Sequence, residues 1–259
     1  MMVESIKELR KICYESRDGE IDWWAKNVST MISIYVTKLL LYTSITANQV
    51  TWSMIIVGLI ASILFSFGNY WFSLMGGLLL HFAIILDGTD GEIARYRKMT
   101  STVGQYLDRL YHDLIPPLIF VSISWGVYHN FPNNVVLLLG SLASVFIILL
   151  RLIDLEKFKL LSQSESQKEG YEEWQRRNHN FGFPSSVIAG FVTYCIKNNI
   201  SLMPANTKVF VNAIFIGALL NYLHLILILY GIAMPCQWIW RNYSNLRALQ
   251  KSDSILHAG

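Results

Sequence analysis

Three long stretches of this chain contain no charged side chain. No Asp, Glu, Lys or Arg occurs in residues 39–86, 114–150 or 209–240. A window of about 18 to 20 uncharged, mostly apolar residues is enough to cross the hydrocarbon core of a bilayer, so each stretch holds one or two spans. Only 15% of the 259 residues are charged, against roughly a quarter in soluble domains. The sequence therefore predicts an all-α integral membrane protein.

Turn-forming and polar segments divide the apolar stretches into six predicted spans. The breaks fall at 68–69, 95–98, 130–133, 154–180 and 204–206. The predicted spans are 48–68, 72–95, 103–127, 133–152, 182–198 and 208–232. We accordingly expect a six-helix transmembrane domain over residues 46–235, with a cytosolic loop at 154–180 and a cytosolic C-terminal tail at 236–259.

Residues 1–45 are predicted to form cytosolic amphipathic and interfacial helices ahead of the first span. Within 1–21, apolar residues recur at three- and four-residue spacing, namely Ile6, Leu9, Ile12 and Cys13. Segment 28–43 is apolar but contains Lys38, which favours a helix lying in the membrane interface with the lysine reaching the headgroups. The alternative, a full span, would bury Lys38 at a cost of roughly 2.5 to 3.5 kcal/mol.

The distribution of basic residues predicts the orientation of the spans. With the N-terminus in the cytosol, 19 of the 21 Lys and Arg residues face the cytosol, and only Lys197 and Lys208 lie outside. Cytosolic loops of membrane proteins carry such an excess of Lys and Arg. We therefore expect both termini to be cytosolic.

Acidic residues gather where the second and third predicted spans meet the cytosol. Asp87 and Asp90 are three residues apart, Asp108 and His112 are four apart, and each pair shares one face of a helix. The short link between the two helices suits an antiparallel turn, which would bring these faces together. Clusters rich in carboxylate oxygens suit hard divalent cations such as Mg²⁺ or Mn²⁺.

Small residues accompany the acidic faces. Gly91, Ala94 and Gly104 remove side-chain bulk beside the carboxylates, which would let a large ligand approach the backbone. The alternative for each is close packing of helices, for which membrane proteins use small residues widely.

These residues resemble the CDP-alcohol phosphotransferase family, whose pattern is D-x2-D-G-x2-A-R-x8-G-x3-D-x3-D. The chain matches this pattern with its spacing intact at Asp87, Asp90, Gly91, Ala94, Arg95, Gly104 and Asp108. Segment 45–51 is similar to the family's T-P-N-x-x-T entry to the first span, with Ala47 at the usual proline. One position departs, because His112 stands where the family has its fourth aspartate.

The resemblance implies a membrane enzyme of phospholipid or related lipid synthesis. Such enzymes move a phosphate-linked group from a CDP-alcohol to an acceptor alcohol and release CMP. It also implies a cytosolic site, Mg²⁺ or Mn²⁺ as cofactor, a homodimer and at least one lipid substrate. The implied metal ligands are Asp87, Asp90, Asp108 and His112. The implied residues that bind the CDP-alcohol are Asp90, Gly91, Ala94, Arg95, Gly104 and Asp108.

The role of His112 stays open between general base, metal ligand and structural residue, and Asp108 is the other expected catalytic residue. Asp113 does not simply replace the missing aspartate, because one helical step turns it about 100° away from the face. Arg109 and Arg151 are candidates for a phosphate of donor or acceptor. Alternatively, Arg151 is a positive-inside anchor and Arg109 balances the acidic cluster.

Glu92 is expected to point away from the acidic face and to pair locally with Arg95 or Arg97. Three other functions stay open from the sequence. A transporter would use intramembrane acids as an ion pathway, a related enzyme would use a soluble CDP-alcohol and a polar acceptor, and a family member with His112 could be non-catalytic. No feature of the chain predicts a nucleic-acid partner.

Overall fold

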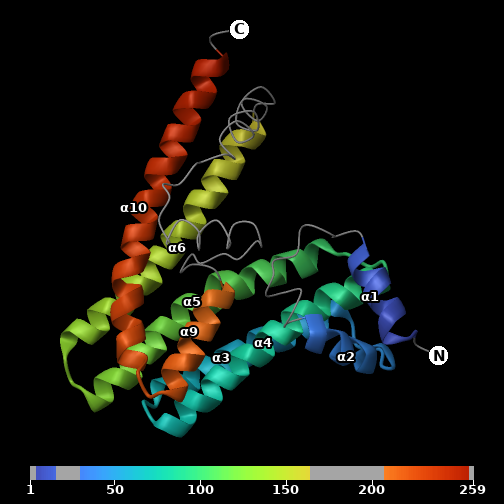
Figure 1. Ribbon diagram of the computed structural model, residues 1–259, viewed down its shortest axis with the longest axis horizontal. Coiled ribbons are helices and arrows are strands. Elements are labelled where there is room, and N and C mark those ends of the chain that lie inside the picture. Colours follow the sequence, from blue (N-terminus) through green and yellow to red (C-terminus); the bar gives the residue numbers. More distant parts are fainter. Residues whose placement is uncertain (1–3, 16–29, 164–206, 257–259) are drawn as a thin grey trace, which may run out of the picture.

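The computed structural model describes residues 4–15, 30–163 and 207–256, and nearly all of them are helical (Figure 1). These ranges contain no strand, which confirms the predicted all-α class. The helices are α1 (Ile6–Tyr14), α2 (Thr30–Leu41), α3 (Ala47–Ser66), α4 (Tyr70–Tyr96), α5 (Thr102–Asn130), α6 (Asn134–Gln163), α9 (Thr207–Leu219) and α10 (Leu223–Leu256).

Five of the described helices are long and apolar enough to cross a membrane: α3, α4, α5, α6 and α10. Their outward faces carry exposed apolar side chains, such as Trp52, Ile56 and Ile63 on α3, and a bilayer solvates such a surface where water would not. The first four predicted spans coincide with helices. The fifth predicted span, 182–198, lies outside the described residues, so the count of six stays a prediction.

The predicted sixth span, 208–232, is wrong as a single helix. The chain turns between α9 and α10, where Asn221 adopts a left-handed conformation with φ 60°. The amide of Tyr222 donates to the carbonyl of Gly217 at 2.7 Å, which closes the end of α9. Two further boundaries differ from prediction: α6 continues to Gln163, into the predicted loop 154–180, and α10 runs uninterrupted through the predicted tail boundary at 235.

The described helices form one connected bundle in which α4 and α5 both pack on α3. In addition, α6 packs on α5 and α10, and α9 packs on α4. Figure 1 shows α6 and α10 running side by side away from the other helices. The most deeply buried side chains of the core include Met54, Phe65, Leu80, Ile119 and Tyr230.

The turn between α3 and α4 touches α5 backbone to backbone. Gly68 has φ 65°, which glycine adopts without strain, and a Cβ built there would lie 2.1 Å from the carbonyl oxygen of Gly126. A Cβ on Gly126 would lie 2.2 Å from the carbonyl oxygen of Phe65. The side-chain amide of Asn130 also donates to the carbonyl of Gly68 at 2.6 Å. Only glycines permit this contact, which joins three helices at one end of the bundle.

The N-terminal helices α1 and α2 pack against α4. A capping box between Ser5 and Glu8 starts α1, which ends at Tyr14; residues 16–21 of the predicted amphipathic segment lie outside the described residues. Of the apolar residues at helical spacing, Leu9 and Cys13 are buried and Ile12 is 46% exposed. The interfacial position of α2 stays a prediction.

Candidate active site

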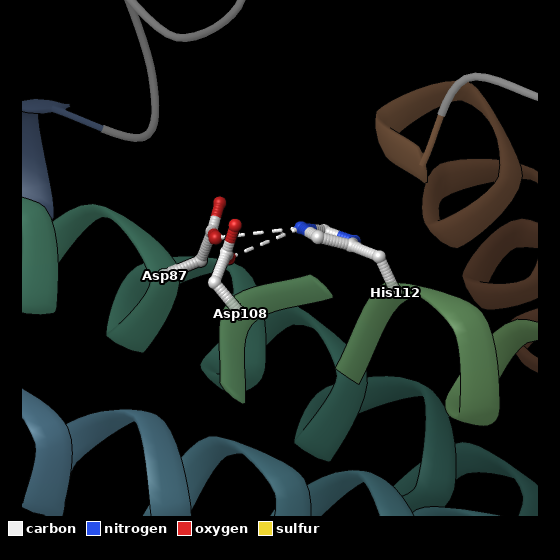
Figure 2. A group of neighbouring side chains, drawn as sticks. All are labelled: Asp87, Asp108 and His112. Carbon is white, nitrogen blue, oxygen red and sulfur yellow. Dashed lines mark ion pairs between the residues drawn. The ribbon is translucent and has the colours of Figure 1, made fainter. Parts of the chain in front are cut away.

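The structure brings together Asp87 near the end of α4 and Asp108 and His112 near the start of α5 (Figure 2). The Nε2 atom of His112 lies 3.6 Å from Oδ1 of Asp87 and 3.5 Å from Oδ1 of Asp108. Figure 2 shows the two carboxylates side by side, with the His112 imidazole extending toward them. All three side chains are partly buried.

The local chain path explains this convergence. Lys98, with φ 52°, lies in the tight turn after α4, and Ser101 starts α5 by accepting a hydrogen bond from the amide of Gly104 at 3.0 Å. The turn sends α5 back antiparallel to α4. Both helices pack on α3 more than on each other. Asp87 on α4 therefore meets Asp108 and His112 on α5 through side chains alone.

The three residues fit a divalent cation. One ligand atom from each lies within 4.8 Å of the other two. The ligands of an octahedral Mg²⁺ lie about 2.0 to 2.1 Å from the ion and therefore about 3 Å from each other. Small side-chain movements would bring the three ligand atoms to this spacing. Two carboxylates suit Mg²⁺ or Mn²⁺, and imidazole is a common transition-metal ligand.

Asp90 lies outside this group of three and faces α3. Its Oδ2 atom accepts a hydrogen bond from Oγ1 of Thr51 at 2.6 Å. Thr51 ends the segment that resembles the family's entry motif, and Thr46 in the same segment caps α3. The predicted metal role of Asp90 stays a prediction, and the sequence did not assign Thr51 a contact with it.

The small residues of the motif have different neighbours. A Cβ built on Gly91 would lie 3.0 Å from Nη1 of Arg95, so the Arg95 guanidinium rests on this glycine. A Cβ built on Gly104 would lie 2.7 Å from Oδ1 of Asn48, which supports the packing alternative for Gly104. Ala94 is partly buried.

The two arginine candidates differ in position. Arg109 is exposed on α5. Arg151 on α6 forms an ion pair with Asp113, with 3.3 Å between Nε and Oδ1. It also lies near enough to Asp108 and His112 to act on both electrostatically. Arg151 therefore lies beside the cluster, and its ion-pair partner Asp113 directly follows His112 in the chain.

The expected local pairing of Glu92 with Arg95 or Arg97 is wrong. Glu92 is completely buried and accepts hydrogen bonds from Tyr14, from Ser33 at 2.5 Å and from Thr37 at 2.5 Å. Arg97 instead donates to the carbonyl groups of Ile45 and Thr43, at 2.7 and 3.0 Å.

Two hydroxyl residues in segment 28–43, Ser33 and Thr37, could have pointed to the true partners of Glu92. They are four residues apart and so share one face of a mostly apolar helix. Such a face needs a polar partner when it is buried.

Residues 44–240 match the family described as CDP-alcohol phosphatidyltransferase. The chain belongs to this family. The bifunctional IPC transferase and DIPP synthase of Aquifex aeolicus (strain VF5) is 35% identical to it over 83 residues, which cover 32% of this chain and 17% of that protein. The match thus spans about a sixth of the length of the relative. Family membership confirms the predicted resemblance, classes the chain with phosphotransferase enzymes rather than transporters, and supports a divalent-metal site.

Proposed function

We propose that the protein transfers a phosphate-linked alcohol group from a CDP-alcohol to an acceptor alcohol. The acceptor hydroxyl oxygen attacks the phosphorus that carries the alcohol group, and a new P–O bond forms. The bond from this phosphorus to the bridging oxygen of the diphosphate breaks, and CMP leaves with that oxygen. The acceptor gives up its proton to a base. The observation that carries the proposal is the convergence of Asp87, Asp108 and His112 within the family's motif.

We assign different residues to binding the cation, binding phosphate oxygens and accepting the proton. Asp87, Asp108 and His112 would hold the cation, with Asp90 beside them. When bound, a divalent cation would neutralise diphosphate charge and charge developing on the CMP leaving group. Arg95, resting on Gly91, and Arg151, beside the cluster, are the groups we assign to phosphate oxygens. His112 or Asp108 accepts the proton of the acceptor hydroxyl.

The membrane setting supports a lipid as one substrate. Apolar side chains cover the outer faces of the spanning helices, so a lipid anchored in the bilayer could reach the space between α4 and α5 laterally. We infer that the site opens to the cytosol, as the basic residues predict. The runner-up is the same chemistry on a soluble CDP-alcohol and a polar acceptor. The homodimer implied by the resemblance stays a prediction.

Release of CMP tests the function directly. The purified protein would be incubated with Mg²⁺, or in parallel with Mn²⁺, and with radiolabelled CDP-diacylglycerol, CDP-choline or CDP-ethanolamine, each with and without a set of acceptor alcohols. We expect acceptor-dependent CMP release from one donor. Glu156→Gln, at an exposed carboxylate on α6 outside the cluster, serves as the control for Asp87→Asn. No CMP from any donor would contradict the proposal.

A further inference from the structure

Glu92 attaches the two N-terminal helices to the end of α4 that carries the site. A buried carboxylate is costly unless hydrogen bonds replace its water. Here Tyr14 of α1 and Ser33 of α2 donate to one carboxylate oxygen, and Thr37 of α2 donates to the other. The thiol of Cys13 also lies 3.6 Å from the backbone carbonyl of Glu92. Only Gly91 separates Glu92 from Asp90 along α4, so this attachment is adjacent to the site but faces away from it.

Tyr14 makes a second contact, with Arg95. The guanidinium carbon of Arg95 lies 5.5 Å from the centre of the Tyr14 ring, within the range of cation–π attraction. Helical side chains lean toward the N-terminus of their helix, and the guanidinium accordingly reaches back to Gly91. The Arg95 side chain is thus held by Gly91 and by the aromatic ring of a different helix.

One atom of Arg95 is left without a protein partner in the described part of the chain. Its Nε is buried and makes no hydrogen bond there. An arginine whose side chain is fixed in place presents its donors to a phosphate with little loss of conformational entropy. If Arg95 binds a phosphate as proposed above, the contact with Tyr14 holds a ligand-binding group in place.

We propose that Tyr14 is a positioning residue of the transferase site, whose ring fixes Arg95 over Gly91 and whose hydroxyl is fixed by Glu92. Tyr14 lies outside the residues that match the family, 44–240, so α1 completes the site from beyond the matched region. The inference rests on the proposed function and deepens it by naming a residue that sets affinity for the CDP part of the donor.

The arrangement couples docking of α1 to substrate binding. If Tyr14 prepares Arg95 for a diphosphate, a bound diphosphate must by reciprocity stabilise the docked position of Tyr14 and α1. Cys13, the neighbour of Tyr14, reports on docking. Its side chain is completely buried, and burial raises the pKa of its thiol to about 11, so the docked thiol reacts slowly with a maleimide.

The kinetic test compares Tyr14→Leu with Tyr14→Phe and with Tyr35→Leu, a matched control at a 61% exposed tyrosine on α2. Tyr14→Leu removes the ring and should raise KM for the CDP-alcohol about tenfold while kcat stays within about twofold. Tyr14→Phe keeps the ring and should recover most of the affinity, and Tyr35→Leu should match the unaltered protein. A Tyr14→Leu variant with unchanged KM, or with only lower yield and kcat, would overturn the proposal.

A labelling test reads the same coupling without catalysis. In a protein with Cys195→Ser and Cys236→Ser, CDP with Mg²⁺ should slow maleimide labelling of Cys13 several-fold, and Tyr14→Leu should abolish this protection. Protection that persists in Tyr14→Leu, or is absent from the parent protein, overturns the inference. Lack of CMP release by the unaltered protein would contradict the transferase assignment instead, so the two failures are distinguishable.

Discussion

Thr51 on α3 donates a hydrogen bond to Asp90 on α4, with 2.6 Å between Oγ1 and Oδ2. The two residues are 39 positions apart and belong to the two separate segments that resemble the family. Thr51 is buried and Asp90 partly so, which makes the bond stronger than one exposed to water. The entry to the first span therefore orients a carboxylate of the acidic motif.

Replacing Thr51 with valine should test this orientation. Valine keeps the shape but removes the donor, and an unmade buried hydrogen bond costs about 1 to 3 kcal/mol. We expect kcat/KM for CMP release to fall about tenfold or more in Thr51→Val. Thr51→Ser keeps the hydroxyl and should retain most of the activity. Equal activity in Thr51→Val and the unaltered protein would show that Asp90 needs no such partner.

Removal of the cation should abolish turnover. Chelation should stop CMP release, and added Mg²⁺ or Mn²⁺ should restore it. Asp87→Asn and Asp108→Asn each remove a charged ligand, so we expect losses of about a hundredfold or more in rate and weaker Mn²⁺ binding by electron paramagnetic resonance. The Glu156→Gln control should bind Mn²⁺ normally. Turnover that survives exhaustive chelation would rule out a metal role for the cluster.

His112 is tested by two substitutions at one position. As base or ligand it must be neutral, so the rate should fall as pH drops below its pKa. His112→Ala should cost on the order of a hundredfold per folded molecule. His112→Asp restores the family's aspartate and should keep measurable activity with a different pH profile. A structural role predicts lower expression of His112→Ala with a nearly normal rate, which would remove His112 from the mechanism.

The orientation in the membrane can be measured with two single cysteines at opposite ends of α5. Met99→Cys and Asn133→Cys place thiols at exposed positions in the turns before and after this helix, in a protein whose native cysteines are replaced by serine. A membrane-impermeant maleimide should label residue 99 from the cytosolic side and residue 133 from the other side. Labelling of both from one side would contradict a membrane-spanning α5.

Helix boundaries were predictable where turn residues interrupt the apolar stretches. Gly68 and Asn69, and the segment 130–133, mark breaks that the structure confirms. The break between α9 and α10 was missed because Asn221 stands alone among leucines and tyrosine, with no glycine or proline beside it. A lone asparagine tolerates the left-handed conformation, yet nothing in its neighbours distinguishes it from a polar residue inside a span.

Helical periodicity predicted only those residues of the candidate site that share one face of a single helix. Spacing along α4 and α5 brought Asp87, Asp108 and His112 together, because each helix carries its own contribution on one face. Thr51 contacts Asp90 and Tyr14 contacts Arg95 because α3 and α1 pack on α4, and no local pattern encodes that packing. Glu92 shows the same limit, since nearby arginines suggested a local ion pair while distant hydroxyls supply its partners.

The glycine contact between Gly68 and Gly126 limits how the bundle can admit a substrate. It joins the α3–α4 turn to α5 with no side chain between the backbones, at the end of these helices farthest along the chain from Asp87 and Asp108. Separation there would break direct main-chain packing and the Asn130 hydrogen bond. Any widening between α4 and α5 would therefore pivot about this end. A small rotation there becomes the largest displacement at the opposite ends of the two helices, near Asp87 and Asp108, where we propose that the diphosphate binds.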